Sequence, residues 1–454
     1  MNIIIVGCGK VGYALAEQLN EEGHDITIMD NSAERLQPAI NNLDVQVFIG
    51  NGTSFLAQKE AGIESADLLI AVTNSDETNL ISCMIAKKAG NNCRTIARVR
   101  NPEYFSELEY IKAAMGISLI INPEYSVAQE IARLIQIPTA MEIDSFAKGR
   151  MELLRIVLPE DSEFDNMKVY EFSKLFHHDV LICILEHEHD FCIPNGNSIL
   201  HAGDSISVIM PRTKIATFCK KLMLTSVREI KDIMIAGGGT TAYYLAELLA
   251  KGGLHVKIVE KDKKRSRFLS LELPKAAIIQ ADATIHENLL ENGLAKMDAF
   301  VSLTPSDEAN IFLSLYANKI APKCKKITKI NKMAQDDIIE DLPLGSVIST
   351  RHTTTEYIIQ YIRSQINSYG SNVEALYRLV ENRVEALEFH IREKCAVTGI
   401  PLQELKLKEN LLLCCIVRGR KVITPSGKDT IELNDTVIVV TTHKCLRGIS
   451  DILR

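Results

Sequence analysis

A short glycine-rich segment near the start of the chain has the residue types and spacing to bind phosphate. It reads Gly7-Cys8-Gly9-Lys10-Val11-Gly12, follows an apolar run and precedes a helical pattern at Tyr13 to Leu19. In such a turn the first glycine permits a tight bend, the second lets the backbone approach a pyrophosphate, and the third lets helix and strand pack closely. Free N–H groups at the helix N-terminus attract the phosphates. The segment therefore predicts a dinucleotide site.

An acid follows at the distance that such a site requires. Asp30 ends the next apolar run, where a carboxylate can accept hydrogen bonds from ribose hydroxyls. This carboxylate would repel a 2′-phosphate, so the sequence favours NAD over NADP. Arg35, five residues later, has two interpretations: contact with the adenine face, or a solvated helix residue.

The whole arrangement occurs twice. Asn2 to Leu19 aligns with Asp232 to Leu249, with nine of eighteen residues identical, and Thr73 to Leu80 aligns with Thr304 to Ile311. A tandem duplication of about 230 residues explains both matches. The second glycine segment reads Gly237-Gly238-Gly239-Thr240-Thr241-Ala242, and Glu260 and Arg265 stand where the first half has Asp30 and Arg35. A second site is predicted, although a duplicated domain can keep its fold and lose its ligand.

Further polar residues follow the strand-like runs, at the sheet edge where ligands bind in such folds. In the first half they are Asn51, Gly52, Thr53, Thr73, Asn74 and Arg98, and in the second half Asp282, Ala283, Thr284, Thr304, Pro305 and Lys329. Thr73 to Asp76 would also cap the helix that follows, which is compatible with ligand contact. Lys10 in the first glycine segment corresponds to neutral Thr240 in the second. We therefore expect the first site to favour the more anionic ligand.

The elements that position these residues alternate along the chain. In each half, short β-branched runs separated by helical patterns predict a parallel sheet, and a shorter stretch of strands and turns follows. The predicted fold is α/β, with two tandem Rossmann-like doubly wound parallel sheets, each followed by a small α+β lobe. The predicted strands of the first half are Ile3–Val6, Ile26–Met29, Val45–Ile49, Leu68–Val72, Thr95–Val99 and Leu119–Ile121, then Ile156–Leu158, Val180–Glu186, Asp190–Ile193 and Ser205–Ile209. The predicted domains are residues 1–136, 137–226, 227–363 and 364–454, with the junction of the halves around Leu222 to Glu229.

Composition excludes several classes of protein. The 454 residues carry 51 basic and 58 acidic side chains, a net charge of -7 that offers no general basic field to nucleic acid. No apolar run is long enough to span a membrane and no leader pattern is present, so a cytoplasmic location is expected. The eleven cysteines form no C-x-x-C pair, which favours reduced thiols over disulfides or zinc.

Catalytic groups are missing from the pattern. The sequence has no nucleophile elbow, no Walker A segment and no duplicated His with a carboxylate partner, so the protein is not expected to be an enzyme. Glu186 to Asp190 is rich in histidine and could bind a metal, but alternating residues at a strand end are more typical of a polar hairpin tip. We therefore predict no metal site.

The ordered motifs resemble a known family. GCGKVGYALAEQL, TNSDETN, ARVRNPEY (Ala97 to Tyr104), SDEAN and the two modules with Pro194, Gly196 and Asp204, and Pro425, Gly427 and Asp435, together resemble the TrkA family of Trk-system potassium uptake regulators. Its members consist of two RCK units, each with a nucleotide-binding N-lobe and a C-lobe. The resemblance covers nearly the whole chain. Thr241, Ala242 and Pro305 depart from the family pattern and weaken the case for the second site.

The resemblance implies a function and a partner. It implies a cytosolic regulator that binds NAD(H), with ATP and ADP as alternatives. It also implies assembly as a homotetrameric ring, peripheral on the inner face of the cell membrane, that gates a Trk-type potassium-translocating membrane subunit. Two other functions stay open: an NAD-dependent oxidoreductase, and a nucleotide-sensing regulator of another cation transporter.

Overall fold

The chain divides into two compact units, each made of segments from both halves. The computed structural model describes residues 1–89, 93–105, 107–147, 149–159, 162–187, 190–223, 230–331, 339, 342–366, 373–380, 383–444, 446 and 448–454. One unit contains Met1–Ala132 and Asp232–Ile359, and the other contains Arg133–Lys231 and Gln360–Arg454. The predicted junction lies outside the described residues except for Leu222 and Met223. No described helix combines the length and apolar character needed to cross a membrane.

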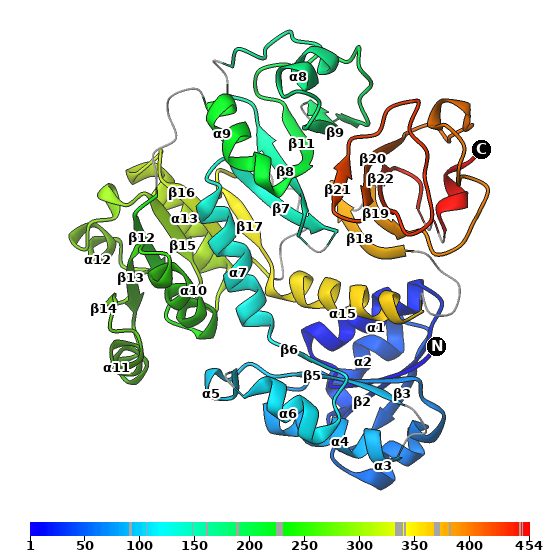
Figure 1. Cartoon of the computed structure of the whole chain (residues 1–454). Helices are drawn as coiled ribbons and strands as arrows, with labels where there is room; N and C mark the ends of the chain where they lie inside the picture. Colours follow the sequence, from blue (N-terminus) through cyan, green and yellow to red (C-terminus); the bar gives the residue numbers. More distant parts are fainter. Residues whose placement is uncertain are drawn as a thin grey trace. The chain divides into compact units, whose positions relative to one another are not determined.

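The first half of the chain begins with a six-stranded parallel sheet, β3-β2-β1-β4-β5-β6 (Figure 1). Its central strands are built from Ile, Leu and Val and are buried on both faces, as the strands of a parallel sheet flanked by helices must be. The elements are β1 (Asn2–Val6), α1 (Lys10–Glu21), β2 (Asp25–Asp30), α2 (Ala33–Asn42), β3 (Gln46–Ile49), α3 (Phe55–Glu60), β4 (Leu68–Ala71), α4 (Asp76–Ala89), β5 (Arg94–Arg98), α5 (Pro102–Phe105), α6 (Leu108–Met115), β6 (Leu119–Ile121) and α7 (Pro123–Gln136).

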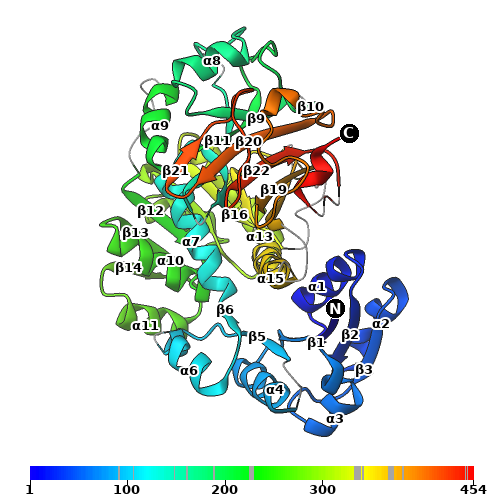
Figure 2. The same ribbon diagram turned by 45° about the vertical axis from the view of Figure 1, so that its right-hand side comes forward.

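The second half repeats this sheet in the order β14-β13-β12-β15-β16-β17. Figure 2 shows it in green to yellow, with α10 and α11 labelled beside it. The elements are β12 (Asp232–Ala236), α10 (Thr240–Lys251), β13 (His255–Glu260), α11 (Lys263–Glu272), β14 (Ala276–Gln280), α12 (His286–Glu291), β15 (Ala299–Ser302), α13 (Asp307–Ile320), β16 (Lys325–Lys329), β17 (Ser346–Ile348) and α15 (Thr350–Ile366). The duplication and the doubly wound parallel sheets are confirmed.

Each half also contributes a five-stranded antiparallel sheet, with orders β10-β9-β11-β8-β7 and β18-β19-β22-β20-β21. These sheets confirm the predicted small α+β lobes. The first lobe consists of β7 (Ala140–Phe146), β8 (Met151–Val157), α8 (Val169–Leu175), β9 (Leu181–His187), β10 (Asp190–Cys192), β11 (Ser205–Pro211) and α9 (Ile215–Met223). The second consists of β18 (Val373–Leu379), β19 (Val384–His390), β20 (Leu411–Arg418), β21 (Lys421–Ile423) and β22 (Thr436–Thr441).

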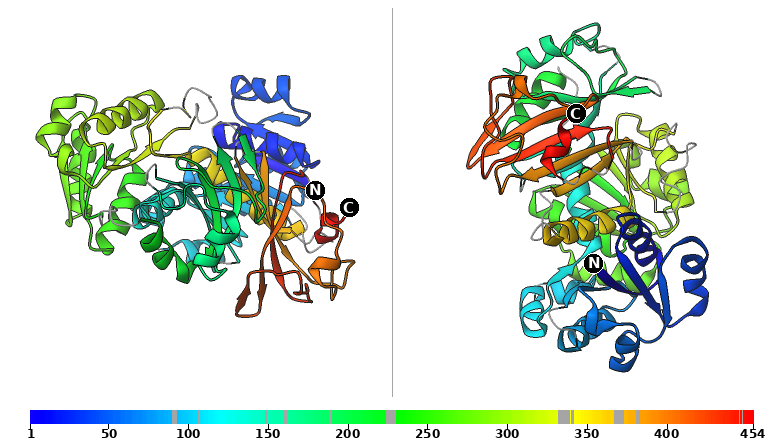
Figure 3. Two further views of the ribbon diagram at one scale, coloured as in Figure 1. Left: turned by 90° about the horizontal axis from the view of Figure 1, so that it is seen from above. Right: turned by 90° about the vertical axis from the view of Figure 1, so that its right-hand side faces the viewer.

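The two small lobes share one apolar core. Cys183 and Ile209 of the first lobe and Cys414 and Ile438 of the second belong to the same buried cluster. The rings of Phe146 and Tyr377 lie 4.5 Å apart, edge to face, a favourable arrangement for aromatic pairs. Figure 3 shows the two sets of strands in green and in orange to red. The lobes therefore fold as one body.

Three strands of these lobes were missed in the sequence. β7, β18 and β19 were not predicted, and β8 begins at Met151 and not at Ile156. In β8 and β19 the reason is that Glu152 and Glu385 are buried on the sheets, 3% and 5% exposed, so polar residues interrupt the expected alternation. Helix α1 also begins at Lys10, three residues before the predicted Tyr13, so Gly12 lies within its first turn.

Candidate nucleotide-binding site

Both glycine segments form the tight turn that their sequences predict. Gly7 and Gly237 have φ angles of +105° and +99°, in the left-handed region that glycine tolerates and other residues rarely adopt. A Cβ atom at Gly12 would lie 1.9 Å from Gly7 O, so only hydrogen fits at that position. Glycine at these positions is therefore a requirement of the turn itself.

The first turns of α1 and α10 are left open at the cavity side. Gly9 and Gly239 are the N-cap residues of the two helices, and neither end has a side-chain cap. A Cβ atom at either glycine would meet nothing within 4 Å. Because the unpaired N–H groups of a helix N-terminus attract anions, each end is suited to a phosphate group.

The acid of each half holds its own glycine turn. Asp30 is 7% exposed, and its carboxylate accepts hydrogen bonds from Cys8 N at 2.8 Å and Ser32 N at 3.0 Å. Glu260 likewise accepts from Gly238 N at 2.6 Å and Asp262 N at 2.7 Å. Each carboxylate thus lies at the end of the second strand, beside the turn. Burial, and secondly the charge of Asp30, raise the pKa of the Cys8 thiol.

The strand ends beside each turn are fixed by a buried asparagine that the sequence analysis did not single out. Asn79 on α4 is 0% exposed and accepts from Thr73 N at 2.8 Å and Thr73 Oγ1 at 2.7 Å. Its amide nitrogen donates to Arg98 O at 2.8 Å and Thr73 O at 3.2 Å. Asn79 therefore joins the ends of β4 and β5, where Thr73 and Arg98 were predicted.

The second half contains the same network. Asn310 accepts from Thr304 N at 2.9 Å and donates to Lys329 O at 2.9 Å. Asn79 and Asn310 occupy equivalent positions in the two repeated blocks, and this repetition is the signal that could have identified them.

A second missed group surrounds Asp76. Its carboxylate accepts from Arg100 N at 2.8 Å and Asn101 N at 2.8 Å, and pairs with Arg100 Nε at 3.4 Å. Arg100 also donates to Asn74 O through Nη2. These bonds direct the side chain of Arg100 toward the predicted Asn74, beside the turn that follows β4.

Both glycine turns open into one cavity of about 1330 Å³ within the unit formed by Met1–Ala132 and Asp232–Ile359. Its volume exceeds the ~300–1,000 Å³ of a single small-molecule site. The predicted residues that line it are Gly7, Gly9, Lys10, Val11, Asp30, Arg35, Asn51, Gly52, Thr73, Asn74, Arg98, Gly237, Gly238, Gly239, Thr240, Thr241, Glu260, Arg265, Asp282, Ala283, Thr284, Thr304, Pro305 and Lys329. Cys8, Gly12 and Thr53 do not line it: Cys8 is buried, Gly12 packs against the turn, and Thr53 is bonded to Asn51.

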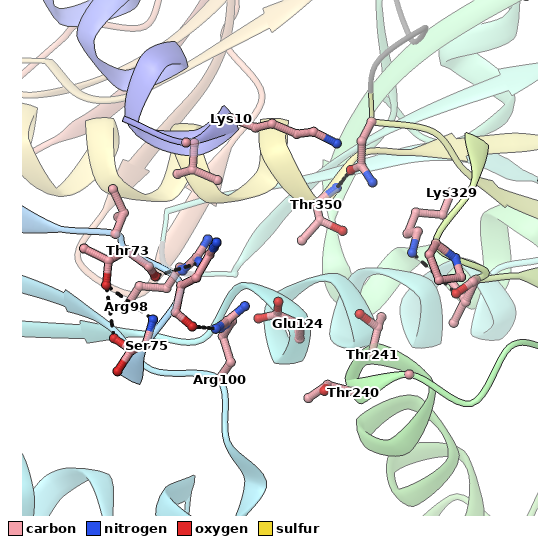
Figure 4. A pocket seen from close by; sticks show the side chains of 18 of the residues that line it. Lys10, Thr73, Ser75, Arg98, Arg100, Glu124, Thr240, Thr241, Lys329 and Thr350 are labelled. Atoms are coloured by element: carbon pink, nitrogen blue, oxygen red, sulfur yellow. Dashed lines mark hydrogen bonds between the residues drawn. The ribbon is translucent and has the colours of Figure 1, made fainter. Parts of the chain in front are cut away.

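Charged side chains of both halves line the cavity. Figure 4 shows Glu124 between Arg100 of the first half and Thr241 of the second in that view. Burial raises the pKa of Glu124, against the smaller opposing effects of Arg98 and Arg100, and its Oε2 has no hydrogen-bond partner among the described residues. Burial lowers the pKa of Lys329, against the smaller opposing effects of Asp307 and Glu124. The cationic groups make the cavity suitable for phosphate groups that bind at either glycine turn.

The histidine-rich stretch shows no metal site in the part that can be seen. Glu188 and His189 lie outside the described residues, and His187 Nδ1 lies 2.6 Å from Asp204 Oδ1. Among the described residues, no three His, Cys, Asp or Glu side chains are grouped as metal ligands.

Comparison with known proteins matches both parts of each half. The family model described as the TrkA-N domain matches residues 3–123 and 233–350, and that of the TrkA-C domain matches 153–223 and 386–453. The chain is 32% identical to a Trk system potassium uptake protein TrkA homolog of Archaeoglobus fulgidus, over 100% of both chains. It is 30% identical to the Trk system potassium uptake protein TrkA of Vibrio alginolyticus, over 100% of this chain and 98% of that one.

Solved structures give the same fold. The GsuK RCK domain is similar with a TM-score of 0.63 at 15% identity, covering 98% of this chain and 92% of that one. The GsuK channel bound to NAD has the same TM-score and identity and covers 98% and 77%. At this identity the likeness establishes the RCK-type fold alone.

Proposed function

The chain belongs to the TrkA family of Trk-system potassium uptake proteins, and from that premise we propose that it is the nucleotide-binding regulatory subunit of a Trk-type potassium uptake system. In this proposal it binds adenine nucleotides in the cavity and gates the potassium-translocating membrane subunit accordingly. The homologues carry the name of potassium uptake proteins, and the family models cover both lobes of each half.

The observation that carries the proposal is the shared cavity with an open helix N-terminus from each half. The space beside Gly9 and Gly239 is unobstructed. Asp30 and Glu260 lie beside their glycine turns. This geometry combines an anion site with a carboxylate acceptor for ribose in each half, which is the chemistry of a dinucleotide or adenine nucleotide site. We assign the predicted residues that line the cavity to these two sites.

NAD(H) is the proposed ligand, with ATP and ADP as alternatives. Asp30 and Glu260 would each repel the 2′-phosphate of NADP, and the related GsuK structures include one bound to NAD and one bound to ADP. Lys10 stands at the first helix N-terminus where the second has Thr240, so the first site takes the more anionic ligand.

Regulation fits the arrangement better than catalysis does. A ligand shifts an equilibrium through its different affinities for two conformations, and side chains of both halves line the same cavity. A closed ring of four chains, peripheral on the inner face of the membrane, would transmit such a shift to the membrane subunit. In this proposal the protein is not an enzyme.

The test uses the full chain with its membrane subunit. The protein is co-purified with the Trk-type subunit and reconstituted into vesicles, and potassium flux is measured with NAD, NADH, ATP or ADP. The proposal predicts that flux changes with at least one nucleotide and that a Gly9→Asp, Gly239→Asp double variant removes the response. Flux that ignores every nucleotide would contradict it. Co-purification of a transporter for another cation, or turnover of NADH, would support the two alternative functions.

A further inference from the structure

One side chain of the second half is hydrogen-bonded to two segments of the first, to a backbone carbonyl in one and to a side-chain amide in the other. Tyr244 lies on α10, the helix that begins at the second glycine turn, and is 1% exposed. Its hydroxyl donates to Arg100 O at 3.1 Å and accepts from Asn122 Nδ2 at 2.9 Å. Both contacts lie within the unit that contains the cavity. A buried hydroxyl with donor and acceptor both satisfied fixes its partners, because an alternative position would leave a polar group unpaired.

The two bonded segments carry the charged side chains of the first site. Arg100 follows β5 two residues after Arg98, and both arginines line the cavity. Asn122 follows β6 and caps α7, since Tyr125 N donates to its side-chain oxygen at 3.0 Å, and Glu124 lies in the first turn of that helix. The Tyr244 hydroxyl therefore helps to fix the segments that carry two arginines and one carboxylate of the cavity.

The corresponding residue of the first half cannot make the same contact in the opposite direction. In the alignment of the two halves, Tyr244 corresponds to Ala14, which has no hydroxyl group. Tyr243 corresponds to Tyr13, so the neighbouring tyrosine is shared by both helices and Tyr244 is particular to the second. The second half thus supports the first site, whereas α1 cannot support the second site in the same way.

We propose that Tyr244 is a positioning residue for the first nucleotide site, whose arginine-bearing and Glu124-bearing segments are held in place by this hydroxyl of the second half. The inference rests on the proposed function, because it assumes that the first glycine turn binds a nucleotide. It makes the first site dependent on the second half, so that a change at α10 is felt among the groups that bind the first ligand.

The test separates the two sites with variants that block one of them. Gly239→Asp leaves only the first site and Gly9→Asp only the second, and Tyr244→Phe is introduced into each. Titration with NADH and ADP is expected to show about fivefold to tenfold weaker binding at the first site, the equivalent of one buried hydrogen bond. Binding at the second site is expected to change by less than about twofold on the same scale.

Tyr243→Phe is the matched control, because it removes a hydroxyl from the same helix without touching Arg100 or Asn122. Asn122→Ser is the second variant: it keeps an oxygen to cap α7 but is too short to reach Tyr244. It is expected to weaken the first site as Tyr244→Phe does, and the double variant to add little further loss.

The outcomes are distinct. Unchanged binding at the first site in both Tyr244→Phe and Asn122→Ser overturns the inference and leaves the proposed function intact. Equal weakening of both sites also overturns it, because Tyr244 then acts on the fold in general. If neither single-site parent binds NADH or ADP, the proposed function fails, and this inference fails with it.

Discussion

Arg265 donates a hydrogen bond from Nε to Gly238 O at 2.7 Å, within the second glycine turn. Its guanidinium also lies 4.8 Å from the centre of the Phe268 ring, a cation–π arrangement. The equivalent Arg35 has a side chain 55% exposed, and its nearest charged partner is Asp30 at 3.8 Å. Arg265 therefore stabilises the glycine turn of the second half, whereas Arg35 of the first half is exposed and available for other contacts.

This difference predicts unequal effects of one substitution. Arg265→Lys removes the planar group that bonds Gly238 and stacks on Phe268, so we expect about fivefold weaker nucleotide binding at the second site. Arg35→Lys keeps a charge near Asp30 and is expected to change the first site by less than about twofold, since exposed ion pairs contribute little. Titrations in Gly9→Asp and Gly239→Asp backgrounds measure the two effects. Equal losses at both sites would contradict this account of Arg265.

The acid of the first site predicts cofactor choice. Asp30→Asn keeps an oxygen that can accept from Cys8 N but loses the charge, so ribose-bearing ligands should bind about 1–3 kcal/mol more weakly. The preference for NADH over NADPH should fall at the same time, because the repulsion of a 2′-phosphate is removed. Competition titrations in the Gly239→Asp background measure the ratio, with Asp25→Asn on the same strand as control. An unchanged ratio would show that Asp30 does not face the ribose.

The buried asparagines predict a loss of stability. In Asn79→Asp a carboxylate oxygen would face Arg98 O and Thr73 O where an amide nitrogen now donates, at a cost of about 2–4 kcal/mol. Asn310→Asp should cost a similar amount. Urea unfolding followed by circular dichroism measures both, and Asn195→Asp, at an exposed turn where the oxygen only accepts, is the control. Variants that unfold at the wild-type urea concentration would show that the network contributes little.

Glu124 predicts a dependence of stability on pH. Its pKa in the folded chain is raised above the ordinary value of 4.5. At a pH between 4.5 and the raised pKa, the folded state therefore binds more protons than the unfolded state. Stability from this group is therefore fully present below pH 4.5 and is lost as pH rises through the raised pKa. Glu124→Gln should be more stable than wild type at pH 8, and the difference should disappear toward pH 4.5. Thermal unfolding of both proteins between pH 4.5 and pH 8 measures this difference in stability. A stability difference that grows as the pH falls would show that the carboxylate is not buried.

Local patterns were enough to predict the parallel sheets and the glycine turns. The turn at Gly7 depends on one strand, one helix and glycines close in sequence, so residue types and spacing specify it. The repeated half confirmed the same elements at Gly237. Asp30 and Glu260 were placed correctly beside their turns because the end of the second strand adjoins the end of the first in this topology.

Other features depend on contacts between distant segments and leave no periodic signal. Tyr244 bonds Arg100 across 144 positions of sequence. Arg100 lies in the ARVRNPEY segment and Tyr244 in the repeated segment Asp232 to Leu249, but neither pattern indicates that the two residues are in contact. The strand carrying Glu385 and the first part of the strand carrying Glu152 were missed because a buried polar residue breaks the alternation that identifies a strand. Asn79 could have been found, since it recurs in both halves, but its hydrogen bonds to two strand ends follow only from the packed structure.

The central claim, that both glycine turns bind nucleotides, is tested most directly by calorimetric titration of NAD, NADH, ATP and ADP. A Cβ atom at Gly9 or Gly239 meets no neighbour, so an aspartate fits at either position without a steric clash. It places a negative charge at the helix N-terminus, where phosphate would bind. Gly448→Asp, at another unobstructed glycine outside the cavity, is the matched control. Two ligands per chain are expected in wild type and the control, one in each single variant and none in the double variant. Double-variant protein that binds every nucleotide as wild type does would contradict the account.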